Sequence, residues 1–235
     1  DMDPVIELAR KHNLTIIEDA AEMHGQTYKG KKCGSFGDVS IFSFYPNKLI
    51  TTGEGGMVVT DDEHIAAKCR KLRNLAFEPE GPRFVHNEMG WNYRMTNVQA
   101  AIGVAQLEKI EEHLAIKKRI GNYYNAGLKN LDGFQQPPVS CSYAENVYWV
   151  YGLVGESESI TNKLKGKLDE RGIGTRPFFW SMHEQPVFRK MGLFKNEKYP
   201  VAEKLSRNGF YIPSGLGLTR DDQDRVINLM LSFHG

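Results

Sequence analysis

The feature that most constrains the fold is a series of short apolar runs, each followed directly by polar or glycine-rich sequence. Residues 14–17 (Leu-Thr-Ile-Ile) follow an amphipathic stretch and end in the acidic pair Glu18-Asp19, and residues 39–44 and 56–60 are two further strand-like runs. A helix, a short buried strand and acidic residues at the strand's carboxyl end are typical of an α/β domain. Because ligands bind beyond the carboxyl ends of such strands, the residues there are the first candidates for a site.

Capping signals and apolar periodicity predict the helices. Thr60 and Glu63 have capping-box spacing for a helix to about residue 75, and Thr96 with Gln99 begins a second helix. That second helix is expected to reach about residue 131, with a break between residues 115 and 121. Beyond a polar linker the pattern is α+β, with strands at 147–154 and 174–179 and helices at 159–171, 197–207 and 219–232. We therefore predict two domains, a large one over residues 1–115 and a small one over residues 116–235.

The composition argues against several classes of protein. Lys+Arg 30 and Asp+Glu 29 give a formal net charge of +1, which argues against a nucleic-acid partner. No apolar run reaches the ~18 residues of a membrane span, so no membrane partner is expected. The three cysteines lack CxxC spacing and the histidines lack ligand spacing, so neither a disulfide framework nor a metal site is predicted, and a reducing compartment such as the cytoplasm is favoured.

Three segments carry residues suited to cofactor chemistry: residues 18–25, 42–48 and 51–56. Asp19 ends one strand, Ser43 ends another, and Lys48 follows five residues after Ser43 in a loop that continues into glycines. The Phe, Tyr, Pro, Leu and Ile residues around Lys48 are expected to desolvate it partly. Desolvation favours the neutral amine, which is the form that Schiff-base chemistry requires.

The other parts of this constellation fit a heteroaromatic phosphate cofactor. A carboxylate such as that of Asp19 can hold a ring nitrogen protonated and make the ring a better electron sink, while Ser43 can donate to a phosphate. Glycines let the backbone approach a ligand closely. Taken singly, each residue has an ordinary interpretation, namely a solvated lysine, a helix-capping aspartate and a glycine turn. Their order and spacing together favour a pyridoxal-phosphate site.

Two other segments allow ordinary interpretations. The run Lys117-Lys118-Arg119 is interpreted as a solvated helix face. The aromatic segment Phe178-Phe179-Trp180 is interpreted as buried packing, with a wall against a sugar or a base as the functional alternative, because aromatic rings offer a large contact area at low entropy cost.

Four motifs together resemble one protein family. They are EDAAEMHG (18–25), GSFGDVSIFSFYPNKLITTGEGG (34–56), GWNYRMTNVQAAIGVAQLEKI (90–110) and GIGTRPFFWSMHEQPVF (172–188). With them the chain resembles, over essentially its whole length, the DegT/DnrJ/EryC1/StrS family of pyridoxal-phosphate-dependent sugar aminotransferases. Within that family the chain is most similar to the branch that forms perosamine by aminating C4 of GDP-4-keto-6-deoxymannose.

The resemblance implies a fold and an extent. The fold is the α/β fold of type I pyridoxal-phosphate enzymes (aspartate aminotransferase-like), with a mixed, mostly parallel sheet in the large domain and a smaller C-terminal α+β domain. Family members carry further sequence before this point, which includes the first strands of the large domain and a phosphate-binding loop. We therefore expect the N-terminal part of the large domain to be absent from this chain.

The resemblance also implies roles for individual residues. Lys48 forms the covalent bond to the cofactor and shuttles protons, Asp19 pairs with the pyridine nitrogen, and Ser43 binds the phosphate. Glu22 stands where many members carry Gln, near the cofactor's phenolic oxygen or facing the substrate. Asn92 reaches the phosphate from the partner subunit, which makes the active site a property of a homodimer.

The substrates are implied in the same way. L-glutamate donates the amino group and a 4-keto-6-deoxy nucleotide sugar accepts it. Arg94, Arg176 and His183 are candidates for binding these substrates, and their ordinary alternatives are a surface salt bridge, a surface charge and a solvated imidazole. Two alternative functions stay open: a sugar dehydratase on the same scaffold, which Lys48 disfavours because such relatives carry His there, and a non-catalytic dimerising relative.

Overall fold

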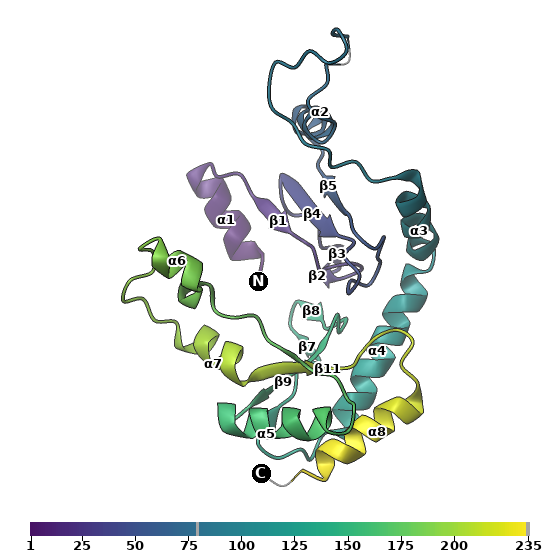
Figure 1. Cartoon of the computed structure of the whole chain (residues 1–235), viewed down its shortest axis with the longest axis vertical. Coiled ribbons are helices and arrows are strands. Elements are labelled where there is room, and N and C mark those ends of the chain that lie inside the picture. Colours follow the sequence, from purple (N-terminus) through teal and green to yellow (C-terminus); the bar gives the residue numbers. More distant parts are fainter. Residues whose placement is uncertain (79, 234–235) are drawn as a thin grey trace. The chain divides into compact units, whose positions relative to one another are not determined.

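The computed structural model describes residues 1–78 and 80–233, and the chain forms two compact units (Figure 1). The first unit comprises Asp1–Leu114 with Ser140–Asn146, and the second comprises Ala115–Val139 with Val147–Gly235. The short segment in the first unit differs from the sequence-based domains, which put it in the smaller domain. Its hairpin of β7 (Ser140–Cys141) and β8 (Ala144–Glu145) is held in the first unit by hydrogen bonds. The N–H of Lys29 donates to the carbonyl of Tyr143 at 2.8 Å, and the side-chain amide of Gln26 donates to the carbonyl of Glu145 at 2.9 Å.

The first unit is built on a three-stranded mixed sheet. Its strands are β1 (Ile17–Asp19), β4 (Val39–Ser43) and β5 (Gly56–Val59), in the order β1-β4-β5. The pair β1–β4 is parallel and the pair β4–β5 is antiparallel. The mixed α/β architecture is therefore confirmed. The same unit contains α1 (Asp3–His12) and a hairpin of β2 (Thr27–Tyr28) and β3 (Lys31–Lys32).

Two helices of this unit begin where side chains satisfy their first backbone N–H groups. α3 (Asn97–Leu107) has the predicted capping box of Thr96 and Gln99. The cap of α2 (Glu63–Leu72) is Asp62 and not Thr60, as its carboxylate accepts from His64 N and Ile65 N. Thr60 was the wrong choice because its hydroxyl donates to the carbonyl of Asp38 at 2.6 Å.

The long helix breaks earlier than the sequence predicts. α3 ends at Leu107 and α4 (Ile110–Gly127) begins three residues later, whereas the expected break at 115–121 lies inside α4. Gly121 suggested a break, but it serves packing, since a Cβ on it would lie 2.4 Å from the ring of Tyr148. A glycine within a helix can thus be required by a neighbouring ring without ending the helix.

The second unit has a four-stranded antiparallel sheet in the order β10-β11-β9-β6. The strands are β6 (Phe134–Gln135), β9 (Tyr151–Gly155), β10 (Arg176–Pro177) and β11 (Gly209–Ile212). The helices that accompany them are α4, α5 (Glu158–Asp169), α6 (Pro186–Lys190), α7 (Pro200–Asn208) and α8 (Arg220–Leu231), with a short 3₁₀ turn η1 (Met182–Glu184).

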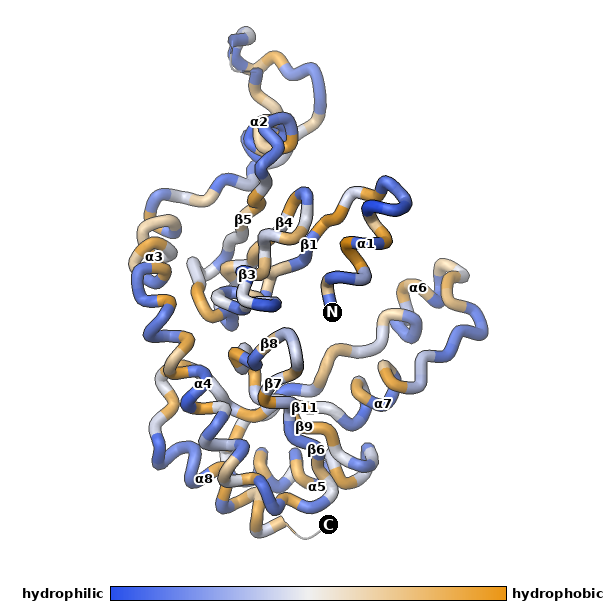
Figure 2. Tube along the Cα trace, turned by 180° about the vertical axis from the view of Figure 1, so that it is seen from behind, coloured by the Kyte–Doolittle hydropathy of each residue, from blue (hydrophilic) through white to orange (hydrophobic). Residues whose placement is uncertain are grey.

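The core of the second unit lies between α4, α5, α8 and the sheet. Both α5 and α8 carry polar and apolar residues (Figure 2). The buried ones lie three or four positions apart or side by side on one face, namely Thr161, Leu164 and Leu168 of α5 and Gln223, Val226, Ile227 and Met230 of α8. The largest fully buried side chains include Tyr124, Tyr151 and Phe210. Burial of these rings supplies much of the driving force for folding, since apolar area removed from water contributes roughly 25 cal/mol per Å².

One expectation about this unit was wrong. Lys117 was assigned to a solvated helix face, yet only 5% of it is exposed, and its Nζ donates to the carbonyl of Ser214 at 2.5 Å. Three successive charges on a helix cannot all face one way, because each residue turns by about 100°. The first residue of the run therefore points inward.

The aromatic segment after β10, residues 178–180, has one ring that is packed and two that are exposed. Phe178 fills space that glycines leave open, as a Cβ on Gly209 would lie 2.2 Å from its ring. Phe179 and Trp180 are exposed, and the guanidinium carbon of Arg207 lies 5.6 Å from the Trp180 ring centroid. None of the helices within the described residues is long and apolar enough to cross a membrane.

Candidate functional site

Lys48 occupies a nearly buried position in the loop that follows β4. The loop turns because the N–H of Lys48 donates to the carbonyl of Tyr45 at 3.0 Å, and the next residues, Leu49 and Ile50, are buried. Only 9% of the Lys48 side chain is exposed, and its Nζ makes a close ion pair with Oε1 of Glu22. Of the apolar neighbours expected from the sequence, Leu49 and Ile50 are buried and Tyr45 is exposed, and the structure adds an acidic partner.

A turn after β1 directs Glu22 toward Lys48. The N–H of Ala20 donates to the carbonyl of Ile41, and the N–H of Met23 donates to the carbonyl of Ala20, both at 3.0 Å. These bonds fold the chain back over the end of the sheet. The carboxylate of Glu22 is 30% exposed, so it lies at the boundary between the buried amine and solvent.

Asp19 and Ser43 lie at the same edge of the sheet. Asp19 is the last residue of β1 and pairs with Ile41, and Ser43 lies two residues further along the parallel strand β4. Asp19 is exposed, and its Oδ1 accepts from the N–H of Ala21 at 3.1 Å. The Ser43 hydroxyl accepts from the N–H of Tyr45 at 3.3 Å. Both side chains thus project at the carboxyl edge where α/β folds bind ligands.

The glycine loop that follows Lys48 has a backbone that favours glycine. Gly53 has φ +79° and Gly55 has φ +151°, and a Cβ on Gly55 would lie 2.6 Å from Oγ1 of Thr52. The loop is tied back to β4, since the N–H of Phe44 donates to the carbonyl of Gly55 at 2.9 Å. The loop therefore holds a fixed position beside Ser43, whose partner across the ladder is Gly56.

Glu18 is a structural neighbour of Asp19. Its carboxylate accepts from the N–H groups of Gly34, Phe36 and Gly37 at 2.5, 2.8 and 3.1 Å. Burial raises the pKa of Glu18, but these hydrogen bonds outweigh burial and the pKa falls below its ordinary value. The two acidic residues at the end of β1 therefore differ in role. Glu18 fixes the loop at residues 34–37, whereas Asp19 is exposed at the sheet edge.

His24 is a residue that the sequence analysis missed. It is 5% exposed, its ring lies 5.5 Å from that of Phe42 and 6.0 Å from that of Phe44, and it forms a hydrogen bond with the backbone of Ser43. Burial and the positive charge of Lys48 lower the pKa of His24. Its Nε2 is buried without a hydrogen-bond partner among the described residues. Its place in the same turn as Asp19 and Glu22 could have identified it.

Asn92 and Arg94 lie in an exposed segment between α2 and α3. The segment is tied to the end of α2, since the N–H of Trp91 donates to the carbonyl of Leu72 at 2.8 Å and Asn92 forms a β-bridge with Asn74. Within the described part of the chain, neither side chain forms a hydrogen bond with Asp19, Glu22, Ser43 or Lys48. The structure thus brings four of the predicted site residues to one sheet edge and leaves these two at a surface.

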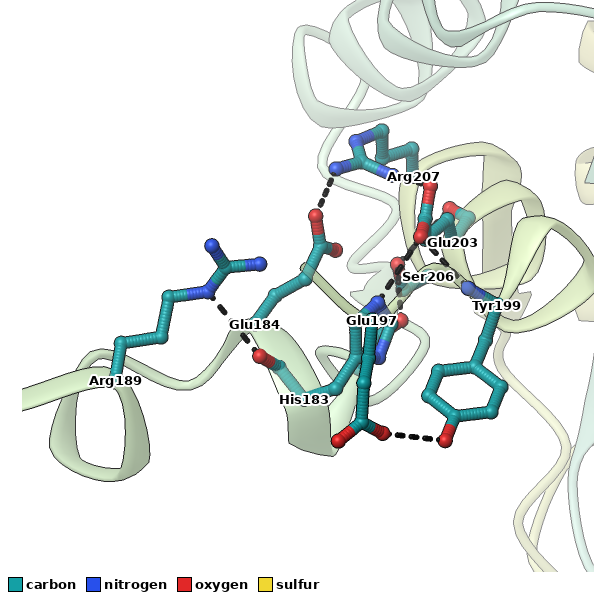
Figure 3. A network of polar contacts seen from close by, with 9 residues as sticks. His183, Glu184, Arg189, Glu197, Tyr199, Glu203, Ser206 and Arg207 are labelled. Carbon is teal, nitrogen blue, oxygen red and sulfur yellow. Dashed lines mark hydrogen bonds and ion pairs between the residues drawn. The ribbon is translucent and has the colours of Figure 1, made fainter. Parts of the chain in front are cut away.

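Arg176 and His183 belong to the second unit. Arg176 is exposed on β10 opposite Tyr211. His183 is buried, which makes the solvated-imidazole alternative wrong. Its Nε2 lies 3.0 Å from Oε1 of Glu203, and its ring packs edge-on against Tyr199 at 4.9 Å (Figure 3).

His183 is part of a network that joins η1 to α7 (Figure 3). Ligand atoms of His183, Glu184 and Glu203 lie within 4.8 Å of one another. However, a guanidinium nitrogen of Arg207 bonds to Glu184 at 2.5 Å, and another lies 3.9 Å from Glu203. Glu203 also accepts from the N–H of Tyr199 at 2.9 Å. Since both carboxylates are already engaged by the guanidinium, and Glu203 also by the N–H of Tyr199, we interpret the group as an ion-pair network and assign it no metal.

Comparisons with known proteins show which proteins this chain is similar to. The chain is 45% identical to GDP-perosamine synthase of Caulobacter vibrioides over 229 residues, which is 97% of this chain and 61% of the relative. It is 38% identical to GDP-perosamine synthase of Escherichia coli O157:H7, over 100% of this chain and 62% of the relative. The crystal structure of S. venezuelae DesV is similar with a TM-score of 0.85 and 33% identity, over 97% of this chain and 60% of that chain.

These alignments establish how the chain relates to longer proteins. It spans about 61% of the length of the first of these curated relatives. The profile of the DegT/DnrJ/EryC1/StrS aminotransferase family matches residues 1–231. Together with the shared fold and the sheet-edge lysine, this match shows that the chain belongs to the DegT/DnrJ/EryC1/StrS aminotransferase family.

Proposed function

We propose that this chain is the lysine-bearing part of a pyridoxal-phosphate-dependent aminotransferase that acts on a nucleotide-linked keto-sugar. The observation that carries the proposal is the nearly buried amine of Lys48, which lies after the carboxyl end of β4 in a chain of this family. A lysine in that place, beside a carboxylate and a glycine loop, is suited to covalent catalysis with an aldehyde.

The residues at the sheet edge fit the cofactor by their chemistry. Lys48 offers an amine for the aldehyde, Asp19 an outward carboxylate for the ring nitrogen, and Ser43 a hydroxyl for the phosphate. Gly53 leaves the backbone open, since nothing lies within 4 Å of the place that a Cβ on it would take. When bound, pyridoxal phosphate supplies a carbonyl carbon and a ring that withdraws electrons from the amino-bearing carbon.

The chain's own residues would then bind, orient and move protons. Asp19 would keep the ring nitrogen protonated, and Ser43 would fix the phosphate end. Lys48, released when an amino substrate displaces it, would carry a proton to and from the substrate carbon. Because one covalent carrier serves two substrates in turn, the kinetics are expected to be ping-pong.

The identity of the substrates rests on the relatives. Two relatives at 45% and 38% identity are named GDP-perosamine synthase, which supports a GDP-linked sugar as a substrate. We propose L-glutamate as the donor and a 4-keto-6-deoxy form of that sugar as the acceptor. Arg94, Arg176 and His183 stay candidates for contacting these substrates. Of the three, His183 would act through its surroundings, because its Nε2 is already bonded to Glu203.

The partners of the chain form the last part of the proposal. Asn92 and Arg94 lie exposed in a segment that also exposes Met89, Trp91 and Tyr93, as expected for a segment that a second subunit covers. We infer a homodimer in which Asn92 reaches the partner's cofactor. Three cysteines without a disulfide favour the reducing cytoplasm as its location.

The test is direct and uses the purified protein with added pyridoxal phosphate. Borohydride reduction followed by peptide mapping is expected to place the cofactor on Lys48. Incubation with L-glutamate and GDP-4-keto-6-deoxymannose is expected to yield 2-oxoglutarate in equal amount to the amino sugar. A cofactor bound to another residue, or product without 2-oxoglutarate, would contradict the proposal, and the second result would instead indicate a dehydratase.

A further inference from the structure

We propose that Gln106 of α3 is a positioning residue that fixes the Lys48 loop (residues 45–51), and with it the amine that bonds to the cofactor. The inference rests on the proposed function, since it concerns where the Lys48 amine is held. Its basis is a pair of hydrogen bonds between the side-chain amide of Gln106 and the backbone of Thr51. The amide nitrogen Nε2 donates to the Thr51 carbonyl at 2.5 Å, and Oε1 accepts from the Thr51 N–H at 3.3 Å.

Thr51 is the residue at which the Lys48 loop closes. The loop leaves β4 at Phe44 and returns to it, because the Phe44 carbonyl accepts from the hydroxyl of Thr51 at 2.9 Å and from the N–H of Thr52 at 3.0 Å. The Thr51 hydroxyl also accepts from the N–H of Gly53 at 3.0 Å. Since Lys48 lies three residues before this closure, a shift of Thr51 would move the amine relative to the sheet edge.

One face of α3 lies along the segment in which the loop returns. The half-buried residues of α3 are Gln99, Ala100, Gly103 and Gln106, and the other residues of this helix are exposed. Positions 99, 103 and 106 share a face because they are four and three residues apart. Nε2 of Gln99 donates to the Glu54 carbonyl at 3.0 Å, and a Cβ on Gly103 would lie 3.0 Å from Cγ2 of Thr52. The helix therefore contacts the returning segment at three successive points, of which Gln106 is nearest in sequence to Lys48.

A primary amide is suited to the backbone of Thr51, because its oxygen accepts from the N–H while its nitrogen donates to the carbonyl. An apolar side chain at position 106 would leave both backbone groups without these partners in a half-buried place. Unpaired polar groups that are shielded from water are costly, so the backbone at Thr51 would relax toward solvent. The Lys48 loop would then occupy several positions, and the amine would face the cofactor in only some of them.

The experiment measures the loop and the cofactor bond separately in Gln106→Met, which keeps the length of the side chain. In cofactor-free protein, we expect hydrogen exchange of backbone amides in peptides covering residues 45–55 to be at least about tenfold faster than in the wild type. Pyridoxal phosphate is then titrated in, and the absorbance of the covalent form gives the midpoint. We expect the midpoint concentration to rise about tenfold, because attachment must now order the loop. Borohydride trapping and peptide mapping identify Lys48 as the attached residue.

The matched control is Gln223 of α8, which is 4% exposed and whose Nε2 donates to the carbonyl of Ile120 at 3.0 Å. Gln223→Met removes the same kind of bond from the core of the second unit. Urea denaturation is expected to show a loss of stability at least as large as that of Gln106→Met. Exchange in residues 45–55 and the midpoint for pyridoxal phosphate are expected to stay within about twofold of wild type. This control separates the positioning of Lys48 from a general loss of stability.

A second variant keeps the test decisive should Gln106→Met fail to fold. Gln106→Glu preserves the length of the side chain and the acceptor for the Thr51 N–H, and its charge can reach water at this half-buried position. It presents an oxygen instead of an N–H group to the Thr51 carbonyl, so that bond is replaced by repulsion. We expect its midpoint to rise at least as much as that of Gln106→Met.

Each result bears on the inference. Faster exchange in residues 45–55 with a raised midpoint, in the Gln106 variants and not in Gln223→Met, supports it. Equal shifts of the midpoint in Gln106→Met and Gln223→Met would overturn it, because lost stability would then explain both. Trapping on Lys48 with the wild-type midpoint in every variant would leave the proposed function intact and refute the role of Gln106. Absence of trapped cofactor on Lys48 in the wild type would instead refute the proposed function, and the exchange data would still decide whether Gln106 holds the loop.

Discussion

The two units each bury a lysine, and the two lysines differ in what surrounds them. Lys48 of the first unit lies in a loop at the sheet edge and pairs with the carboxylate of Glu22. Lys117 of the second unit lies on α4, and its Nζ donates to the carbonyl of Ser214, with no carboxylate in ion-pair distance among the described residues. Burial lowers the pKa of Lys117 to about 8.

The comparison shows that desolvation by itself does not mark a catalytic lysine. Desolvation was one argument for Lys48 as a nucleophile, yet Lys117 is also desolvated, since it is 5% exposed and burial lowers its pKa. What distinguishes Lys48 in the structure is its place at the carboxyl edge of the strands and the partly exposed carboxylate that is paired with its amine. Lys117 instead holds the chain at Ser214 against α4, which is a structural task.

The largest expected effect separates the two lysines by activity. Lys48→Arg keeps a positive charge beside Glu22 but removes the primary amine, so turnover should fall by more than about a thousandfold. Lys117→Met should stay within a few-fold of wild type. Steady-state assays with both substrates, at matched cofactor occupancy, measure this. Comparable losses of turnover in the two variants would contradict the assignment of a catalytic role to Lys48 and a structural role to Lys117.

The next effect concerns stability and pH. A lysine whose pKa is about 8 when folded and about 10.5 when unfolded binds more protons in the unfolded chain between these values. Its contribution to the free energy of unfolding therefore rises with pH in this window. From pH 7 to 9.5 the wild type should gain about 2 kcal/mol relative to Lys117→Met, since one pKa unit corresponds to about 1.4 kcal/mol.

Urea denaturation at the two pH values measures this difference. The control is Lys129→Met at an exposed position, which gives the background that any lost lysine causes. If the stability gap between wild type and Lys117→Met stays constant with pH, the Lys117 amine is better solvated than its 5% exposure implies.

A smaller effect on stability is expected from the hydrogen bond to the carbonyl of Pro213. The hydroxyl of Tyr124 donates to the carbonyl of Pro213 at 2.9 Å, directly before the carbonyl that Lys117 binds. Tyr124→Phe should lower the free energy of unfolding by about 1 kcal/mol through this lost bond. Tyr123→Phe, whose hydroxyl bonds to Asp224 in a partly buried pair, is the adjacent control with a smaller expected loss. Thermal or urea denaturation ranks the two.

Much of the fold could be predicted because its signals are local. The capping pair Thr96 and Gln99 and the strand at 39–44 are local features, and the structure shows both. The cap of α2 and the break at 108–109 were missed because competing local signals decide them. Thr60 and Asp62 are both capping residues, and only the tertiary bond from Thr60 to Asp38 assigns the cap to Asp62.

The candidate site also has a part that local sequence predicts and a part that depends on the tertiary fold. Strand ends and a glycine loop pointed to Asp19, Ser43 and Lys48, since their place follows from chain order. The ion pair of Lys48 with Glu22 joins residues 26 positions apart and depends on how the turn after β1 folds back. The burial of Lys117 depends on the rotation of α4, which a run of three charges does not reveal. Long-range contacts were thus the part that sequence pattern could not supply.

The smallest expected effect tests whether Lys48 acts electrostatically on its surroundings while Lys117 does not. Burial lowers the pKa of His24, and the charge of Lys48 lowers it further. Lys48→Met removes the second contribution, so the pKa of His24 should rise, though not to its ordinary value because burial persists. An NMR titration of the His24 ring measures the shift, with Lys117→Met as the control that leaves it unchanged. No change in Lys48→Met would mean that the charge of Lys48 does not reach the histidine, and a fall would contradict the direction of the Lys48 contribution.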